Sequence, residues 1–192
     1  MKKLLAALAL TSALVAAQSS EFTFDPAQTK VEFTLGSLLH TVHGTFALKR
    51  GELRFDPATG VASGDLVVDA TSGASGNNSR DRRMHKDVLQ SDKYPSIEFH
   101  ADRVEGKVMP QATSHVQLHG MFTIHGAAHE MTVPVVVQSD GGRHTATAQF
   151  EIPYVKWGMK NPSTLMLRVN DKVEITVQTV STPAPVTAAH SN

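Results

Sequence analysis

Apolar and polar residues alternate with a period of two along most of the chain. Val31, Phe33 and Leu35 fall on one face of an expected strand, and polar residues fall on the other. This alternation is typical of a β-strand with one buried face and one face in water. It recurs at residues 46–49, 53–55, 66–68, 97–99, 116–118, 133–137, 146–150 and 173–177. The pattern predicts an all-β fold.

Short turn sequences separate these segments, namely residues 56–60, 126–128 and 140–142. They are rich in glycine, proline and aspartate, which favour tight turns. Many short strands joined in this way indicate an antiparallel sandwich or a closed barrel, in one domain. A barrel of about eight strands has an interior that side chains can fill or that can hold one ligand.

One segment, residues 79–90, has helical spacing instead. It follows an expected loop at residues 71–78, and Asn78 or Ser79 is the expected N-cap. Met84, Val88 and Leu89 form a narrow apolar stripe on this expected helix. Such a stripe can plug one end of a barrel and complete its core, or it can cover a hollow interior as a lid.

The two ends of the chain are expected to lie outside the barrel. Residues 1–17 have a basic start, a short apolar run and small residues suited to cleavage, which predicts a secretory signal peptide. Residues 181–192 have too little apolar content to pack and are expected to be disordered. The domain is therefore assigned to residues 18–180, in a periplasmic or secreted protein that is not an integral membrane protein.

The charge of the chain argues against a nucleic-acid partner. The sequence has 18 basic and 18 acidic residues, so loss of Lys2 and Lys3 with the signal peptide leaves 16 against 18, a net charge of −2. Nucleic-acid-binding domains normally carry a basic patch. With no cysteine, the mature chain has no disulfide and no thiolate ligand for a metal.

Ten histidines raise the question of a metal site. His115 and His119 are expected on one strand face, roughly 13 Å apart at about 3.3 Å per residue, which is too far to share an ion. His125 and His129 flank a short turn and are expected to be cross-strand neighbours, and His40 and His43 border another loop. Two imidazoles alone make an incomplete site, so no metal or other cofactor is assigned.

No arrangement typical of catalysis is found. Serines at Ser72 and Ser75 precede glycines, but they lack the strand-to-helix turn that a nucleophile elbow needs. No phosphate-binding glycine loop is found either. The chain is therefore interpreted as a binding protein rather than an enzyme.

Several motifs in a fixed order resemble the YceI-like family. They are residues 41–46, 51–56, Arg80-Asp81 followed by Met84-His85 and Val88-Leu89, then 93–99 and 119–126. The resemblance covers nearly all of residues 22–178. It implies an extended, eight-stranded, lipocalin-like antiparallel barrel, exported by bacteria, that holds an isoprenoid or other long amphiphile in its interior. Arg80 and Asp81 are interpreted as a helix cap and ion pair that fix the loop, rather than as contacts for a ligand head group.

The expected function is to bind and carry, or sequester, a long-chain isoprenoid or fatty amphiphile. Small residues on inner faces, such as Val67, Val137, Ala146 and Ala148, are compatible with a hollow interior. The alternatives are a histidine-dependent metal-binding protein or hydrolase, and a solid-cored stress protein. A homodimer through edge strands is also possible. The ligand-binding residues are predicted to be Phe33, Leu35, Phe46, Leu48, Leu66, Val68, Met84, Val88, Leu89, Phe99, Leu118 and Phe122.

Overall fold

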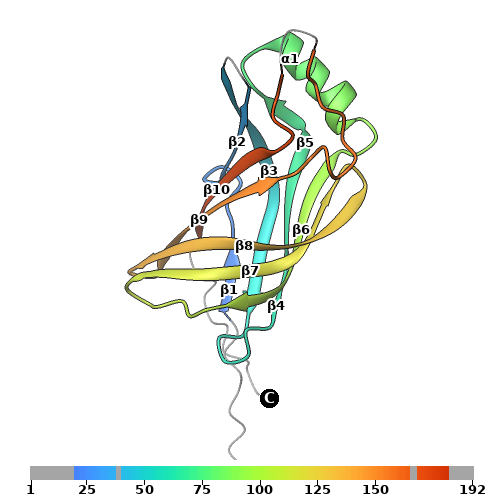
Figure 1. Cartoon of the computed structure of the whole chain (residues 1–192). Coiled ribbons are helices and arrows are strands. Elements are labelled where there is room, and N and C mark those ends of the chain that lie inside the picture. Colours follow the sequence, from blue (N-terminus) through green and yellow to red (C-terminus); the bar gives the residue numbers. More distant parts are fainter. Residues whose placement is uncertain (1–19, 38–39, 165–167, 182–192) are drawn as a thin grey trace, which may run out of the picture.

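A computed structural model describes residues 20–37, 40–164 and 168–181. This part of the chain contains ten β-strands and a single helical segment, which lies at one end of an elongated barrel (Figure 1). The strands are β1 (Ser20–Thr23), β2 (Lys30–Gly36), β3 (Thr41–Phe55), β4 (Ala62–Ser63), β5 (Asp65–Ala74), β6 (Ser96–Glu105), β7 (Thr113–Ile124), β8 (Ala127–Asp140), β9 (Arg143–Ile152) and β10 (Val173–Ser181).

Eight of these strands close into an antiparallel barrel. The strand order is β3-β2-β10-β9-β8-β7-β6-β5, and β3 also pairs with β5, which closes the ring. The short strands β1 and β4 both pair with β3, outside this ring. The predicted all-β, eight-stranded lipocalin-like barrel is confirmed.

Strand β3 joins two segments that the sequence pattern separates. It runs for 15 residues from Thr41 to Phe55, and its pairing with β5 shifts register twice, between Thr45 and Ala47 and between Leu48 and Arg50. Irregularities of this kind bend a strand and increase its twist. They allow one strand to pair with β2 and β5 along one part and with β1 and β4 along another.

The β7–β8 hairpin has a two-residue turn formed by His125 and Gly126. Both residues have positive φ, at 52° and 77°. Paired positive φ values are the mark of the type I′ turn that matches the twist of a hairpin. A Cβ atom at residue 126 would lie 2.4 Å from the Tyr94 ring, so only glycine fits there. The predicted turn at 126–128 therefore begins one residue earlier and is shorter.

The helical segment has two parts, α1 (Asn78–Arg83) and the π-helical turn η1 (Met84–Leu89). Its N-cap is Asn77, whose side chain accepts hydrogen bonds from the backbone N–H groups of Ser79 and Arg80. The predicted N-cap, Asn78 or Ser79, is therefore wrong by one or two residues. The segment ends at Gln90, which adopts the left-handed conformation that commonly terminates helices.

The predicted loop at residues 71–78 is partly wrong, because β5 continues to Ala74. The Ser72 hydroxyl accepts a hydrogen bond from the backbone N–H of Ala47 at the first register shift. Gly73 faces the ring of Phe46, where a Cβ atom would approach to 2.5 Å. Ser72 thus bonds to an irregular part of the β3–β5 ladder, and Gly73 allows a close contact with an aromatic ring. The composition of the segment alone suggested a loop.

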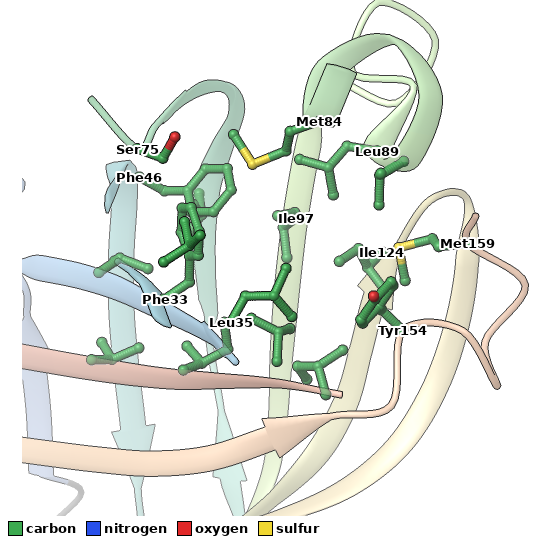
Figure 2. Close-up of a pocket in the computed structure, with 18 of the residues that line it drawn as sticks. Phe33, Leu35, Phe46, Ser75, Met84, Leu89, Ile97, Ile124, Tyr154 and Met159 are labelled. Carbon is green, nitrogen blue, oxygen red and sulfur yellow. The ribbon is translucent and has the colours of Figure 1, made fainter. Parts of the chain in front are cut away.

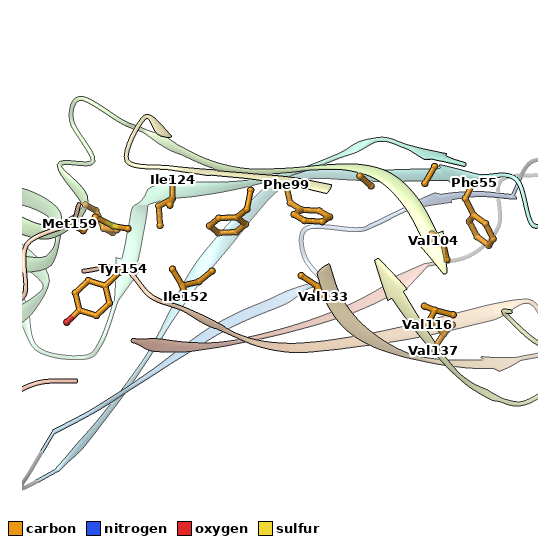
Figure 3. Close-up of a cluster of buried hydrophobic side chains, with 14 residues drawn as sticks. Phe55, Phe99, Val104, Val116, Ile124, Val133, Val137, Ile152, Tyr154 and Met159 are labelled. Carbon is orange, nitrogen blue, oxygen red and sulfur yellow. The ribbon is translucent and has the colours of Figure 1, made fainter. Parts of the chain in front are cut away.

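Buried apolar side chains follow the length of the barrel (Figure 3). At one end lie Tyr154 and Met159, and at the other Phe55, Val104 and Val137. Ser181 is the last residue of β10 and only 4% exposed, so the folded part extends at least one residue beyond the predicted limit of residue 180. The predicted signal peptide and the rest of the predicted tail lie outside the described residues.

Candidate functional site

The barrel encloses a cavity of about 600 Å³. This volume is typical of a site for a small organic ligand. All twelve residues that the sequence singled out as ligand-binding border it. Their contact with a ligand stays a prediction, but the structure brings them together around one space. The alternative of a solid-cored barrel is wrong.

Many further apolar residues complete the wall, mostly from strands β8, β9 and β10. Most of them could have been found from the period-two pattern, since they continue the inner faces already recognised. Tyr154 and Met159 could not, because they come from the irregular segment after β9. The wall residues that were not among the twelve predicted ligand-binding residues include Val31, Ile97, Ile124, Val133, Val135, Ala148, Phe150, Ile152, Tyr154, Met159, Val173, Ile175 and Val177.

Two glycines place an aromatic pair in the wall. Phe33 and Phe46 lie on neighbouring strands with ring centroids 5.5 Å apart. A Cβ atom at Gly44 would lie 2.3 Å from the Phe33 ring, and one at Gly73 would lie 2.5 Å from the Phe46 ring. Each ring therefore packs directly on the backbone of a strand. This leaves the space towards the barrel axis open.

The helical segment covers one end of the cavity (Figure 2). Met84 and Leu89 point from it towards Phe46 and Ile97 on the strands below. Val88 also borders the cavity. The two readings of the apolar stripe, as a plug of the barrel end and as a lid over a hollow, thus describe the same arrangement.

Polar groups gather at this end of the cavity. Arg80 donates to the hydroxyl and carbonyl oxygens of Ser75 at 2.7 and 2.9 Å, and the Asp81 carboxylate accepts from the Ser75 N–H at 3.0 Å and from its hydroxyl. No ion pair joins Arg80 to Asp81 in the described residues, so that part of the prediction is wrong. The two residues do fix the loop, as predicted, but through hydrogen bonds to Ser75. Ser37, His40, Asn77, Ser79 and Arg83 also border the cavity near this end.

Tyr154 contributes a neutral aromatic wall. Burial, together with the nearby charge of Asp171, raises the pKa of Tyr154 to about 12. Its hydroxyl donates to the backbone carbonyl of Asn170 at 2.6 Å. The phenol is therefore uncharged and already bonded, and it presents its ring to the cavity.

A second cavity of about 100 Å³ adjoins the first. Leu66, Leu118, Val135, Ala148 and Val177 border both. The second cavity also contacts Phe22 and Phe55, so it lies towards the barrel end opposite the helix (Figure 3). Three of the four small residues proposed as inward-facing border these cavities, namely Val137, Ala146 and Ala148. Val67 is buried but borders neither.

The histidines do not form a metal centre in the described residues, where no group of three potential ligands is placed to hold an ion. His129 pairs in register with Phe122, while His125 lies in the turn, so the predicted cross-strand pair is wrong. His125 packs on Tyr94, and His129 stacks on Trp157 at 3.9 Å. His40 borders the cavity, whereas His43 bonds to Thr34 on an exposed face.

His119 bridges three strands on the outside of the barrel. Its Nδ1 lies 2.6 Å from a carboxylate oxygen of Asp102, and its Nε2 lies 3.1 Å from one of Glu130. Both nitrogens must carry protons to donate to both carboxylates, which requires the imidazolium form. The hydrogen bond to Asp102 is the main cause that raises the pKa of His119.

We expect NMR titration of His119 to give a pKa above 6.5, because its carboxylate partners stabilise the charged ring. Since the folded-state pKa is raised, the stabilisation is complete below pH 6.5 and is lost as the pH rises through the folded-state value. Asp102→Asn should lower the pKa towards 6.5. A wild-type pKa at or below 6.5 would contradict the bridge.

The chain belongs to the YceI-like family, whose YceI-like domain matches residues 22–181. A search of the curated proteins found no match.

In the described residues no helix is long and apolar enough to cross a membrane.

Solved structures share the fold. BcnA from Burkholderia cenocepacia is similar with a TM-score of 0.67 and 23% identity over 83% of this chain and 99% of that one. A polyisoprenoid-binding domain from Saccharophagus degradans, implicated in plant cell wall breakdown, has a TM-score of 0.64 and 14% identity, over 87% of this chain and 100% of that one. The YceI protein of Campylobacter jejuni has a TM-score of 0.53 and 13% identity, over 96% of this chain and 99% of that one. At these identities the similarity establishes the fold alone.

Proposed function

We propose that this protein binds and carries, or sequesters, a long-chain amphiphile with an isoprenoid or fatty tail inside the barrel. The observation that carries this proposal is the 600 Å³ cavity with its aliphatic and aromatic wall. A polyisoprenoid-binding domain among the structures of the same fold supports it. The twelve predicted residues would contact the tail, and no chemical step is assigned to them.

Burial of the tail would supply the affinity. Transfer of hydrocarbon from water to an apolar site gains about 0.8 kcal/mol for each buried methylene. A chain of many methylene or isoprene units therefore needs no charged anchor. A larger part of this gain is retained if the cavity exists before binding, since little ordering is then required.

The polar groups near the helix would contact the head of the amphiphile. The Arg80 side chain is already bonded to Ser75, whereas the side chain of Arg83, which borders the cavity, has no hydrogen bond or ion pair in the part of the chain described. A cation at this place favours a head group with an acceptor oxygen. The selectivity for the head would thus come from Arg83 and the neighbouring hydroxyl groups.

The expected place of action is the periplasm or the outside of the cell, following the signal peptide inferred for residues 1–17. Closure of the barrel leaves its eight strands without free edges. A homodimer, if one forms, would use the short strands β1 or β4 or another face. Dimerisation remains a prediction that sedimentation of the purified protein can check.

Native mass spectrometry of gently purified protein tests the proposal. We expect a bound species with the mass of a long-chain lipid, which organic solvent extracts. Protein freed of lipid should take up geranylgeraniol or hexadecanoic acid in equimolar amount. Recovery of chain-free protein that takes up neither probe would contradict the proposal.

A further inference from the structure

The inner wall of the barrel changes from apolar to polar over three successive layers towards the end opposite the helix. Across strands β8, β9 and β10, the first layer is Val135, Ala148 and Val177. Two residues further along each strand, the register brings together Val137, Ala146 and Thr179. The next layer consists of Ser139, His144 and Ser181. The inner face of β10 thus ends in two hydroxyl residues after an aliphatic run.

The Thr179 hydroxyl has no partner. Thr179 is only 4% exposed and borders the second cavity, and its Oγ1 has no hydrogen bond within the described residues. Valine has nearly the same shape as threonine, and a buried hydroxyl without a partner destabilises the fold. An unpaired hydroxyl at this place is explained if a ligand supplies the missing partner.

His144 adds a second polar group to the same cavity. Its Nδ1 lies 2.8 Å from the Ser139 hydroxyl, and its ring meets the Phe22 ring edge-on. Burial lowers the pKa of His144. A neutral imidazole can donate from one nitrogen and accept at the other. The cavity therefore offers neutral donor and acceptor groups, with aromatic rings opposite.

We infer that this cavity is a subsite for a neutral hydrogen-bonding group at the distal end of the ligand chain, such as a terminal hydroxyl. This inference rests on the proposed function, and it narrows the ligand class to chains that are polar at both ends. Thr179 lies six residues from Val173, which borders the main cavity, and this span is about 20 Å along an extended strand. A long acyl or isoprenoid chain can cover such a distance.

The test compares hexadecanoic acid with its ω-hydroxy derivative by calorimetric titration of lipid-free protein. Wild-type protein should bind the ω-hydroxy chain about three- to tenfold more tightly, as one additional hydrogen bond predicts. Thr179→Val should abolish this preference, so that the variant binds the two chains equally tightly. Thr176→Val, on the opposite face of β10, should retain the wild-type preference.

The ligand-free Thr179→Val protein should also unfold at the same temperature as wild type or at a higher one, because a hydroxyl without a partner is replaced by an isosteric methyl. Equal affinity of wild-type protein for the two chains would overturn the subsite and leave the proposed function intact. If the Thr179→Val protein still preferred the ω-hydroxy chain, the subsite would likewise be overturned and the proposed function would stand. Failure of wild type to bind either chain would overturn both.

Discussion

Replacement of Ala148 by tryptophan should abolish ligand binding without unfolding the barrel. Ala148 lies on β9 between Val135 and Val177 and borders both cavities, so it lies where a chain that occupies both would pass. An indole group would fill this passage. Tryptophan is well accepted in β-strands, and the existing cavity gives it room. We expect the affinity for hexadecanoic acid to fall at least about a hundredfold, equivalent to about 2.7 kcal/mol.

The neighbouring residue provides a matched control for this substitution. Gln149 is exposed on the outer face of the same strand. Gln149→Trp should bind the chain as wild type does, and both variants should show the same β-sheet circular dichroism. Unchanged affinity in a folded Ala148→Trp protein would show that the chain does not occupy this passage.

Gly120→Ala should be strongly destabilising, because β6 and β7 approach closely at this residue. A Cβ atom there would lie 2.1 Å from the carbonyl oxygen of His100 and 3.0 Å from the Cα of Ala101. Both are backbone atoms, so no side chain can rotate away, and the ladder itself must shift. We expect a loss of about 3 kcal/mol or more in the free energy of unfolding. This corresponds to a fall of about 10 °C in Tm.

Thermal unfolding followed by circular dichroism measures this effect. Gly76 serves as the control, because a Cβ atom there meets nothing within 4 Å. Its φ of +78° suits asparagine, so Gly76→Asn should cost about 1 kcal/mol or less. A Gly120→Ala protein as stable as Gly76→Asn would mean that the two strands are further apart than described.

The barrel and most of its inner wall were predictable, because side-chain direction alternates strictly along a strand. Phe33, Phe46 and Phe122 could be placed inside from their own segments alone. The alternating segments 133–137 and 173–177 also contain Val133 and Ile175, which line the cavity although they were not among the predicted ligand-binding residues. Hydrophobic alternation is visible in each segment by itself, and each strand keeps it in the folded protein because successive side chains point to opposite faces.

Features that depend on distant parts of the chain were not predictable in this way. The continuation of β5 to Ala74 depends on pairing with β3, and Ser72 and Gly73 alone resemble a loop. His129 was misplaced because the two-residue turn sets a register that pairs it with Phe122. Tyr154 reaches the cavity from an irregular segment that has no periodicity. The second cavity is lined by residues from strands β1, β3 and β5 to β10, so no single segment reveals it.

A crystal structure of protein that is purified gently, with no step that removes bound lipid, tests the central claim most directly. The account predicts continuous tubular electron density from beneath Met84 and Leu89, past Ala148, to the cavity bordered by Thr179. The density should follow the apolar wall without branching towards the outer faces of the strands. A barrel interior in which these side chains close upon one another, or which holds only ordered water, would contradict it.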